Sequence, residues 1–78
     1  MAINYLEEIP KVISLLQSEG LGSNASEVQA AFEAASTSTE LLMGVRFTLQ
    51  QIPSNKTSAT TKQRIEALIS VIDTILSR

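Results

Sequence analysis

The sequence of 78 residues contains no cysteine and no histidine, and its aromatic residues are one tyrosine and two phenylalanines. The chain therefore has no imidazole base, no thiolate nucleophile and none of the usual soft ligands of structural zinc. It also has no disulfide framework, so the fold must be held by packing alone, which favours a cytoplasmic protein. We expect a non-enzymatic protein that binds no metal and no cofactor.

Long apolar runs are absent as well. No stretch approaches the run of about 20 apolar residues that spans a bilayer. Glu7 and Glu8, with no Lys or Arg, precede the first apolar segment, so the sequence predicts neither a signal peptide nor a membrane anchor. The formal net charge of -2 argues against binding to the phosphate backbone of nucleic acids.

The charges are unevenly distributed along the chain. Residues 1–40 carry six acids against one base, whereas residues 41–78 carry five bases against two acids, so the halves carry -5 and +3. Two interpretations are open. The acidic half attracts a basic partner, or the two halves complement one another within the fold.

Apolar residues recur at helical spacing in four segments, and no segment alternates with the period of a strand. The predicted helices cover residues 4–19, 24–36, 38–52 and 60–77. No helix of this length is stable unless its apolar stripe is buried against a neighbour. The short connections predict an all-α fold, a single small antiparallel four-helix bundle comprising residues 1–78.

Capping residues mark the expected helix starts, since each is followed three residues later by Glu or Gln. The predicted N-caps are Asn4, Asn24, Thr37 and Thr60. Gly20 and Gly22 end the first helix, and Pro53 ends the third. The polar residues 54–61 are expected to form a linker on the surface.

Pro10 is the discordant residue of the first segment. Inside a helix, a proline removes the hydrogen bond to the carbonyl four residues earlier, here that of Leu6, and kinks the helix. The alternative is that the regular helix begins only near Ile9.

The predicted third helix carries two apolar stripes, whereas an ordinary surface helix needs one. Its first stripe is suited to a core and consists of Leu42, Val45, Leu49 and Ile52. Met43 and Phe47 form the second stripe, beside Arg46. Either this is a central helix covered by three neighbours, with Gly44 permitting a close crossing, or these three residues form an exposed patch for a partner or a second copy.

The glutamates of the first half have no spacing typical of a calcium loop or a di-metal site, so most are expected to lie on solvated helix faces. As functional residues they would present charge to a basic surface. The residues predicted to bind a partner are Glu27, Glu33, Glu40, Met43, Arg46 and Phe47.

The stretch Ser36-Thr-Ser-Thr-Glu-Leu-Leu-Met-Gly-Val-Arg-Phe47, with the acidic first half, resembles small all-helical bacterial immunity proteins. These proteins neutralise a co-produced toxin. The resemblance implies an immunity- or antitoxin-type inhibitor that binds a toxin domain through an acidic helical surface. The alternative hypothesis is a small structural or regulatory protein that forms a homodimer through Met43 and Phe47.

Overall fold

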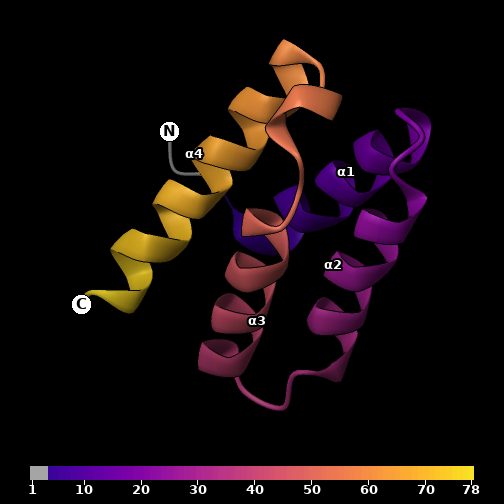
Figure 1. The fold of residues 1–78 in the computed structure, drawn as a ribbon. Coiled ribbons are helices and arrows are strands. Elements are labelled where there is room, and N and C mark those ends of the chain that lie inside the picture. Colours follow the sequence, from indigo (N-terminus) through magenta and orange to yellow (C-terminus); the bar gives the residue numbers. More distant parts are fainter. Residues whose placement is uncertain (1–3) are drawn as a thin grey trace.

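The computed structural model describes residues 4–78, which form four α-helices and one short 3-10 helix, with no strand in that range. The elements are α1 (Tyr5–Ser18), α2 (Gly22–Ala34), α3 (Ser38–Gln50), η1 (Ser54–Lys56) and α4 (Ala59–Leu76). Consecutive α-helices run in opposite directions (Figure 1). The predicted all-α, antiparallel four-helix bundle is confirmed.

The helices pack in a ring, in which α1 and α3 each contact both α2 and α4. The core consists of the apolar stripes that these contacts bury. Its buried members are Ile9, Val12, Ile13, Leu16, Ala25, Val28, Leu42, Val45, Leu49, Ile65, Leu68 and Ile72. Helix α2 contributes two of the smaller side chains, Ala25 and Val28, and its Phe32 is half-buried against the same core. Small side chains on this face let α2 lie close to its neighbours.

The turn between α1 and α2 is a Schellman motif. The Leu21 amide donates to the Leu16 carbonyl at 2.9 Å, and the Gly20 amide donates to the Gln17 carbonyl at 3.3 Å. Gly20 has a φ of 78°, in the left-handed region that side chains with a Cβ avoid. The chain then enters α2 at Gly22, so the predicted start of this helix, with Asn24 as its N-cap, is wrong. Leu21 holds that position and packs against the core.

Helix α1 begins at Tyr5, where the side chain of Asn4 accepts a hydrogen bond from the Leu6 amide at 3.1 Å. The Asn4 cap is confirmed, and a helix start near Ile9 is wrong. Pro10 therefore lies inside the helix. Leu6 and Pro10 are both exposed, so water can reach the carbonyl that the proline leaves without its helical donor.

The starts of the last two α-helices differ in how well the sequence predicts them. Thr37 caps α3 as expected, because its hydroxyl accepts from the Glu40 amide at 3.1 Å. The predicted cap of α4 at Thr60 is wrong. Ser58 holds that position, and its hydroxyl accepts from the Thr61 amide at 3.2 Å.

A glutamate at the end of α1 secures the start of α4. The Glu19 carboxylate accepts a hydrogen bond from the Ser58 amide at 2.7 Å and another from the hydroxyl of Thr61. Thr61 is buried, with 1% of its surface exposed. The Thr61 and Ser58 hydrogen bonds lower the pKa of Glu19, since they stabilise its ionised form. A negative charge at a helix N-terminus is also favoured by the helix dipole.

The close approach of α2 and α3 leaves space for one more methyl group. A Cβ placed on Gly44 would lie 3.5 Å from the Cβ of Ala31, an ordinary van der Waals contact. We expect Gly44→Ala to raise the free energy of unfolding by up to about 1 kcal/mol, because alanine favours the helix. Gly20→Ala should lower it by about 1 kcal/mol, because of the left-handed φ. Thermal unfolding of both variants measures these changes, and a lower melting temperature for Gly44→Ala would show that the helices cannot accept the methyl group.

Glu19 should make folding stability dependent on pH. Its pKa is lowered in the folded state, so its contribution is present above the ordinary pKa of a glutamate and is lost as the pH falls through the folded-state pKa. We expect Glu19→Gln to destabilise the protein from neutral pH down to about pH 5, and its deficit relative to the wild type to shrink below that. Urea unfolding across this range measures the deficit. Glu33→Gln, a change at an exposed glutamate of α2, is the control and should show no such dependence.

Candidate functional site

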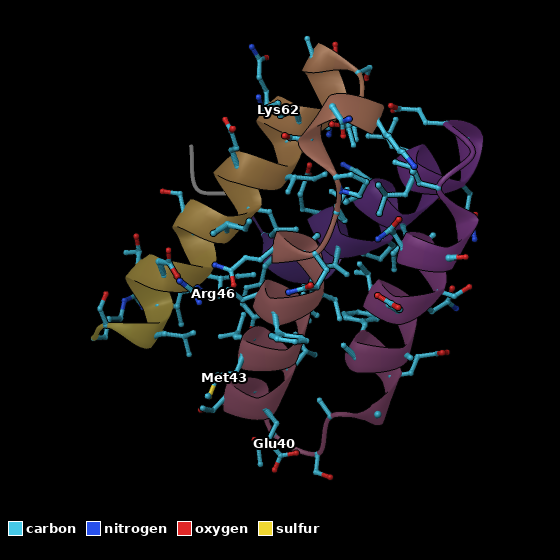
Figure 2. All side chains as sticks on the ribbon, viewed as in Figure 1. Glu40, Met43, Arg46 and Lys62 are labelled. Atoms are coloured by element: carbon cyan, nitrogen blue, oxygen red, sulfur yellow. The ribbon has the colours of Figure 1, made fainter. Side chains whose placement is uncertain are left out.

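Two large apolar side chains lie exposed on α3. Met43 is 58% exposed and Phe47 is 63% exposed, one helical turn apart. The buried residues of α3 form its other stripe, and its main contacts are with α2 and α4. The interpretation of α3 as a central helix covered by three neighbours is therefore wrong. Figure 2 shows Met43 and Arg46 on the side of α3 that faces α4.

A groove of about 640 Å³ lies between α3 and the last turns of α4. The two helices diverge toward the N-terminal end of α3 (Figure 1). The side chains that line the groove are those of Met43, Arg46, Phe47, Gln50, Asp73, Leu76 and Ser77. Its apolar members come from both helices, so this α3–α4 groove combines apolar surface with polar groups.

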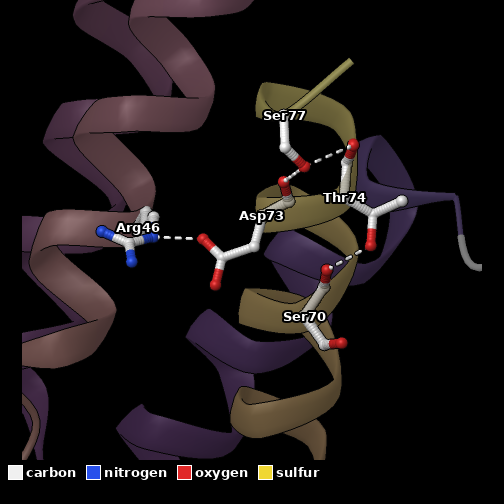
Figure 3. Close-up of polar contacts among 5 residues, drawn as sticks. All are labelled: Arg46, Ser70, Asp73, Thr74 and Ser77. Carbon is white, nitrogen blue, oxygen red and sulfur yellow. Dashed lines mark hydrogen bonds and ion pairs between the residues drawn. The ribbon is translucent and has the colours of Figure 1, made fainter.

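Arg46 is paired within the α3–α4 groove. Its Nε donates a hydrogen bond to Oδ1 of Asp73, which links α3 to α4 (Figure 3). The two side chains are 38% and 49% exposed, so the pair contributes less than about 1 kcal/mol to stability. The main effect of the pairing is to neutralise both charges within the groove.

The hydroxyl groups at the end of α4 are also engaged. Ser77 donates to the carbonyl of Asp73 at 2.6 Å, and Thr74 donates to the carbonyl of Ser70 at 2.9 Å (Figure 3). Such bonds satisfy backbone acceptors in the last turns of a helix. These hydroxyls therefore complete the helix rather than point a free donor into the groove.

A second groove, of about 580 Å³, lies on the other side of Phe47, between α2 and α3. Its lining residues are Asn24, Glu27, Ala30, Phe47, Thr48 and Gln51. Phe47 lines both grooves and so forms the ridge between them. Within residues 4–78, the carboxylate of Glu27 makes no hydrogen bond or ion pair.

The remaining predicted residues are Glu40 and Glu33. Glu40 lies near Met43 at the start of α3 (Figure 2), where its carboxylate accepts a hydrogen bond from the Ser36 amide at 3.3 Å. Glu33 lines a separate groove between α1 and α2, together with Phe32 and others. Because Glu33 is six residues from Glu27, the two side chains leave α2 in directions about 120° apart. The structure therefore groups the other five predicted residues around α3 and leaves Glu33 apart.

Sequence reasoning missed the partners of these residues. Asp73 neutralises Arg46 from another helix, and Asn24 and Gln51 join Glu27 in the α2–α3 groove. Antiparallel pairing of the third and fourth predicted helices was the signal that could have placed Arg46 near Asp73. No comparable signal existed for Gln51, because its place beside Glu27 depends on the register between α2 and α3, which is set by side-chain packing.

The two halves of the chain complement one another in part. Nη1 of Arg64 on α4 lies 2.9 Å from Oε1 of Glu8 on α1, and Glu19 secures the start of α4. The ion pair with Arg64 supports the interpretation of intramolecular charge complementarity for Glu8, whereas the partners of Glu19 are uncharged amide and hydroxyl groups. These contacts leave Glu27 available to a basic partner.

Similarity to known proteins does not indicate a function for this surface. Comparison with protein-family models, curated proteins and solved structures finds no match to the chain. In the described part of the chain, no three acidic, histidine or cysteine residues gather where they could hold a metal ion. Nor does any helix within residues 4–78 combine the length and apolar character required to cross a membrane.

Substitutions at two residues of α3 test whether its second stripe is exposed while its first stripe belongs to the core. Leu49 is 2% exposed, whereas Phe47 is 63% exposed. We expect Leu49→Ala to lower the free energy of unfolding by about 2–5 kcal/mol. Phe47→Ala should lower it by less than about 1 kcal/mol, because little of its contact area is lost. Urea unfolding of both variants measures the difference, and similar losses would show that Phe47 is part of the core.

Proposed function

We propose that this protein is a non-enzymatic protein-binding module, and that its contact surface is the α3 surface, defined by Met43, Arg46 and Phe47 together with the grooves on either side of Phe47. The observation that carries this proposal is the exposure of Met43 and Phe47 one helical turn apart on α3, with Phe47 at the border of two grooves. Met, aromatic residues and Arg are enriched at the centres of protein interfaces. An exposed aromatic anchor flanked by hollows is suited to contact a complementary partner.

We propose further that the partner is a toxin, as in immunity-type inhibitors. Two features support this class: the resemblance of residues 36–47 and the acidic groups Glu27 and Glu40 around the apolar centre. Acids at the rim of an interface raise the association rate with a basic surface and select among partners. Glu33 lies outside this surface and serves as a control.

Site-specific photo-crosslinking in the host tests the proposal. A photoreactive phenylalanine analogue at position 47 should form a crosslink to a single heterologous protein, whereas the same analogue at Gln29, an exposed residue of α2 outside the two α3 grooves, should not. Phe47 is exposed, so the analogue is compatible with the fold. Crosslinks that are equally abundant and diverse at both positions would contradict a specific α3 surface.

A separate experiment tests whether the protein inhibits a toxin. If the crosslinked protein is a toxin, co-expression of this chain should protect cells from it, and the Phe47→Asp variant should protect at least tenfold less, in line with the loss of one central interface residue. Glu33→Gln should protect as well as the wild type. A crosslinked partner without toxicity would overturn the inhibitor class and leave the α3 surface intact.

Self-association is the second candidate, and the same apolar stripe favours it. A stable dimer of standard size buries about 800 Å² on each partner. Met43 and Phe47 alone supply only a part of such an area, so a dimer would also require the grooves beside them. In this case the crosslink at position 47 joins two copies of the chain, and sedimentation shows a dimer that Phe47→Asp dissociates.

A further inference from the structure

We infer that the α2–α3 groove binds an arginine side chain of the protein partner, with its guanidinium group between the Phe47 ring and the Glu27 carboxylate. This inference rests on the proposed function and adds the chemistry of the group that the partner presents. It is drawn from the charge and hydrogen-bonding character of the groove.

The polar lining of this groove is able to accept hydrogen bonds, and its one charge is negative. Glu27 is an acceptor with both oxygens, and the amide oxygens of Asn24 and Gln51 are acceptors as well. Thr48 donates its hydroxyl proton to the carbonyl of Val45 at 2.9 Å, so its oxygen keeps lone pairs for an incoming donor. No base is among the lining residues. A cationic group with several donors therefore complements this groove.

The ring of Phe47 adds a second kind of attraction. It is 63% exposed and borders the same groove as Glu27. The face of an aromatic ring attracts cations, and arginine is the side chain found most often in such contacts. Guanidinium is planar, stacks on aromatic faces and offers five donors, whereas the lysine ammonium is a compact and strongly hydrated point charge. The combination of ring, carboxylate and amide acceptors thus favours arginine over lysine.

The α3–α4 groove has a different character. Its basic and acidic members, Arg46 and Asp73, pair with one another, and Met43 and Leu76 supply apolar surface. The partner would therefore place apolar side chains on the α4 side of Phe47 and the arginine on the α2 side. This division fixes the orientation of the partner on α3.

Nuclear magnetic resonance of the full chain with small probes tests the assignment. The probes are the α-N-acetyl amides of arginine, lysine and citrulline, the last being the uncharged analogue of arginine. We expect the arginine probe to bind with a dissociation constant on the order of 10 mM and to shift the amide signals of Glu27, Phe47, Thr48 and Gln51. Glu27→Gln should weaken this binding about threefold to fivefold, the range of an exposed ion pair.

Control variants and control probes show whether binding of the arginine probe depends on the position of the charge, on the Phe47 ring and on the guanidinium group. Glu33→Gln removes the same charge from the same helix outside the groove, and it should leave the binding unchanged. Phe47→Leu keeps an apolar side chain without the ring and should weaken binding about twofold to fivefold. Equal binding of citrulline, equal binding of lysine, an equal effect of Glu33→Gln, or shifts confined to another part of the surface would each overturn the arginine assignment.

The failure of this inference is separable from failure of the proposed function. If the probes do not bind in the α2–α3 groove while position 47 still forms a crosslink to one protein, the partner contacts Phe47 without an arginine in this groove. If neither is observed, the α3 surface itself is wrong. Binding of the arginine probe together with the loss of the crosslink in Glu27→Gln would support both.

Discussion

The packing of α2 against α3 determines which side of α3 meets solvent. Ala31 of α2 and Gly44 of α3 face one another, and a Cβ at position 44 would lie 3.5 Å from the Cβ of Ala31, so this contact has space for a methyl group, whereas a much larger side chain would push the helices apart. With α2 and α3 packed in this way, the first stripe of α3, which includes Leu42 and Val45, is buried in the core, and the second stripe is exposed. Both grooves beside Phe47 lie on the side of α3 that this packing leaves exposed, and so does the candidate site.

Local patterns in the sequence were sufficient to predict the four helices, their antiparallel order and the buried stripe of α3. They were insufficient for the start of α4, because Thr60 has the spacing of a capping box with Gln63, whereas Ser58, the actual cap, is followed three residues later by Thr61. The choice depends on Glu19, which is 39 residues away from Ser58 and binds its amide. A contact of this range has no periodic signal in the sequence. The start of α2 was missed for a local reason, since the Schellman turn between Leu16 and Leu21 leads directly into the helix before Asn24.

The same limit applies to the candidate site. The stripe of Met43 and Phe47 was visible in the sequence, but its exposure depended on how many neighbours cover α3, and two interpretations remained open. The grouping of Glu27 with Phe47 required the register between α2 and α3, which is set by side-chain packing. The separation of Glu33 from Glu27 on α2 follows from helical geometry alone, so the sequence was sufficient to predict it.

Stability does not account for the identity of residues 43 and 47. A polar side chain at either position would leave the buried stripe of α3 intact, because the core contacts are made by other residues. Exposed apolar side chains also carry a cost, since they favour non-specific association. The surrounding charges limit this cost: Asp73 and Arg46 neutralise one another on one side of Phe47, and Glu27 repels acidic surfaces on the other. An apolar ridge with a neutral groove on one side and an acidic groove on the other discriminates among the surfaces that approach it, and such discrimination is the property that a specific protein-binding module requires.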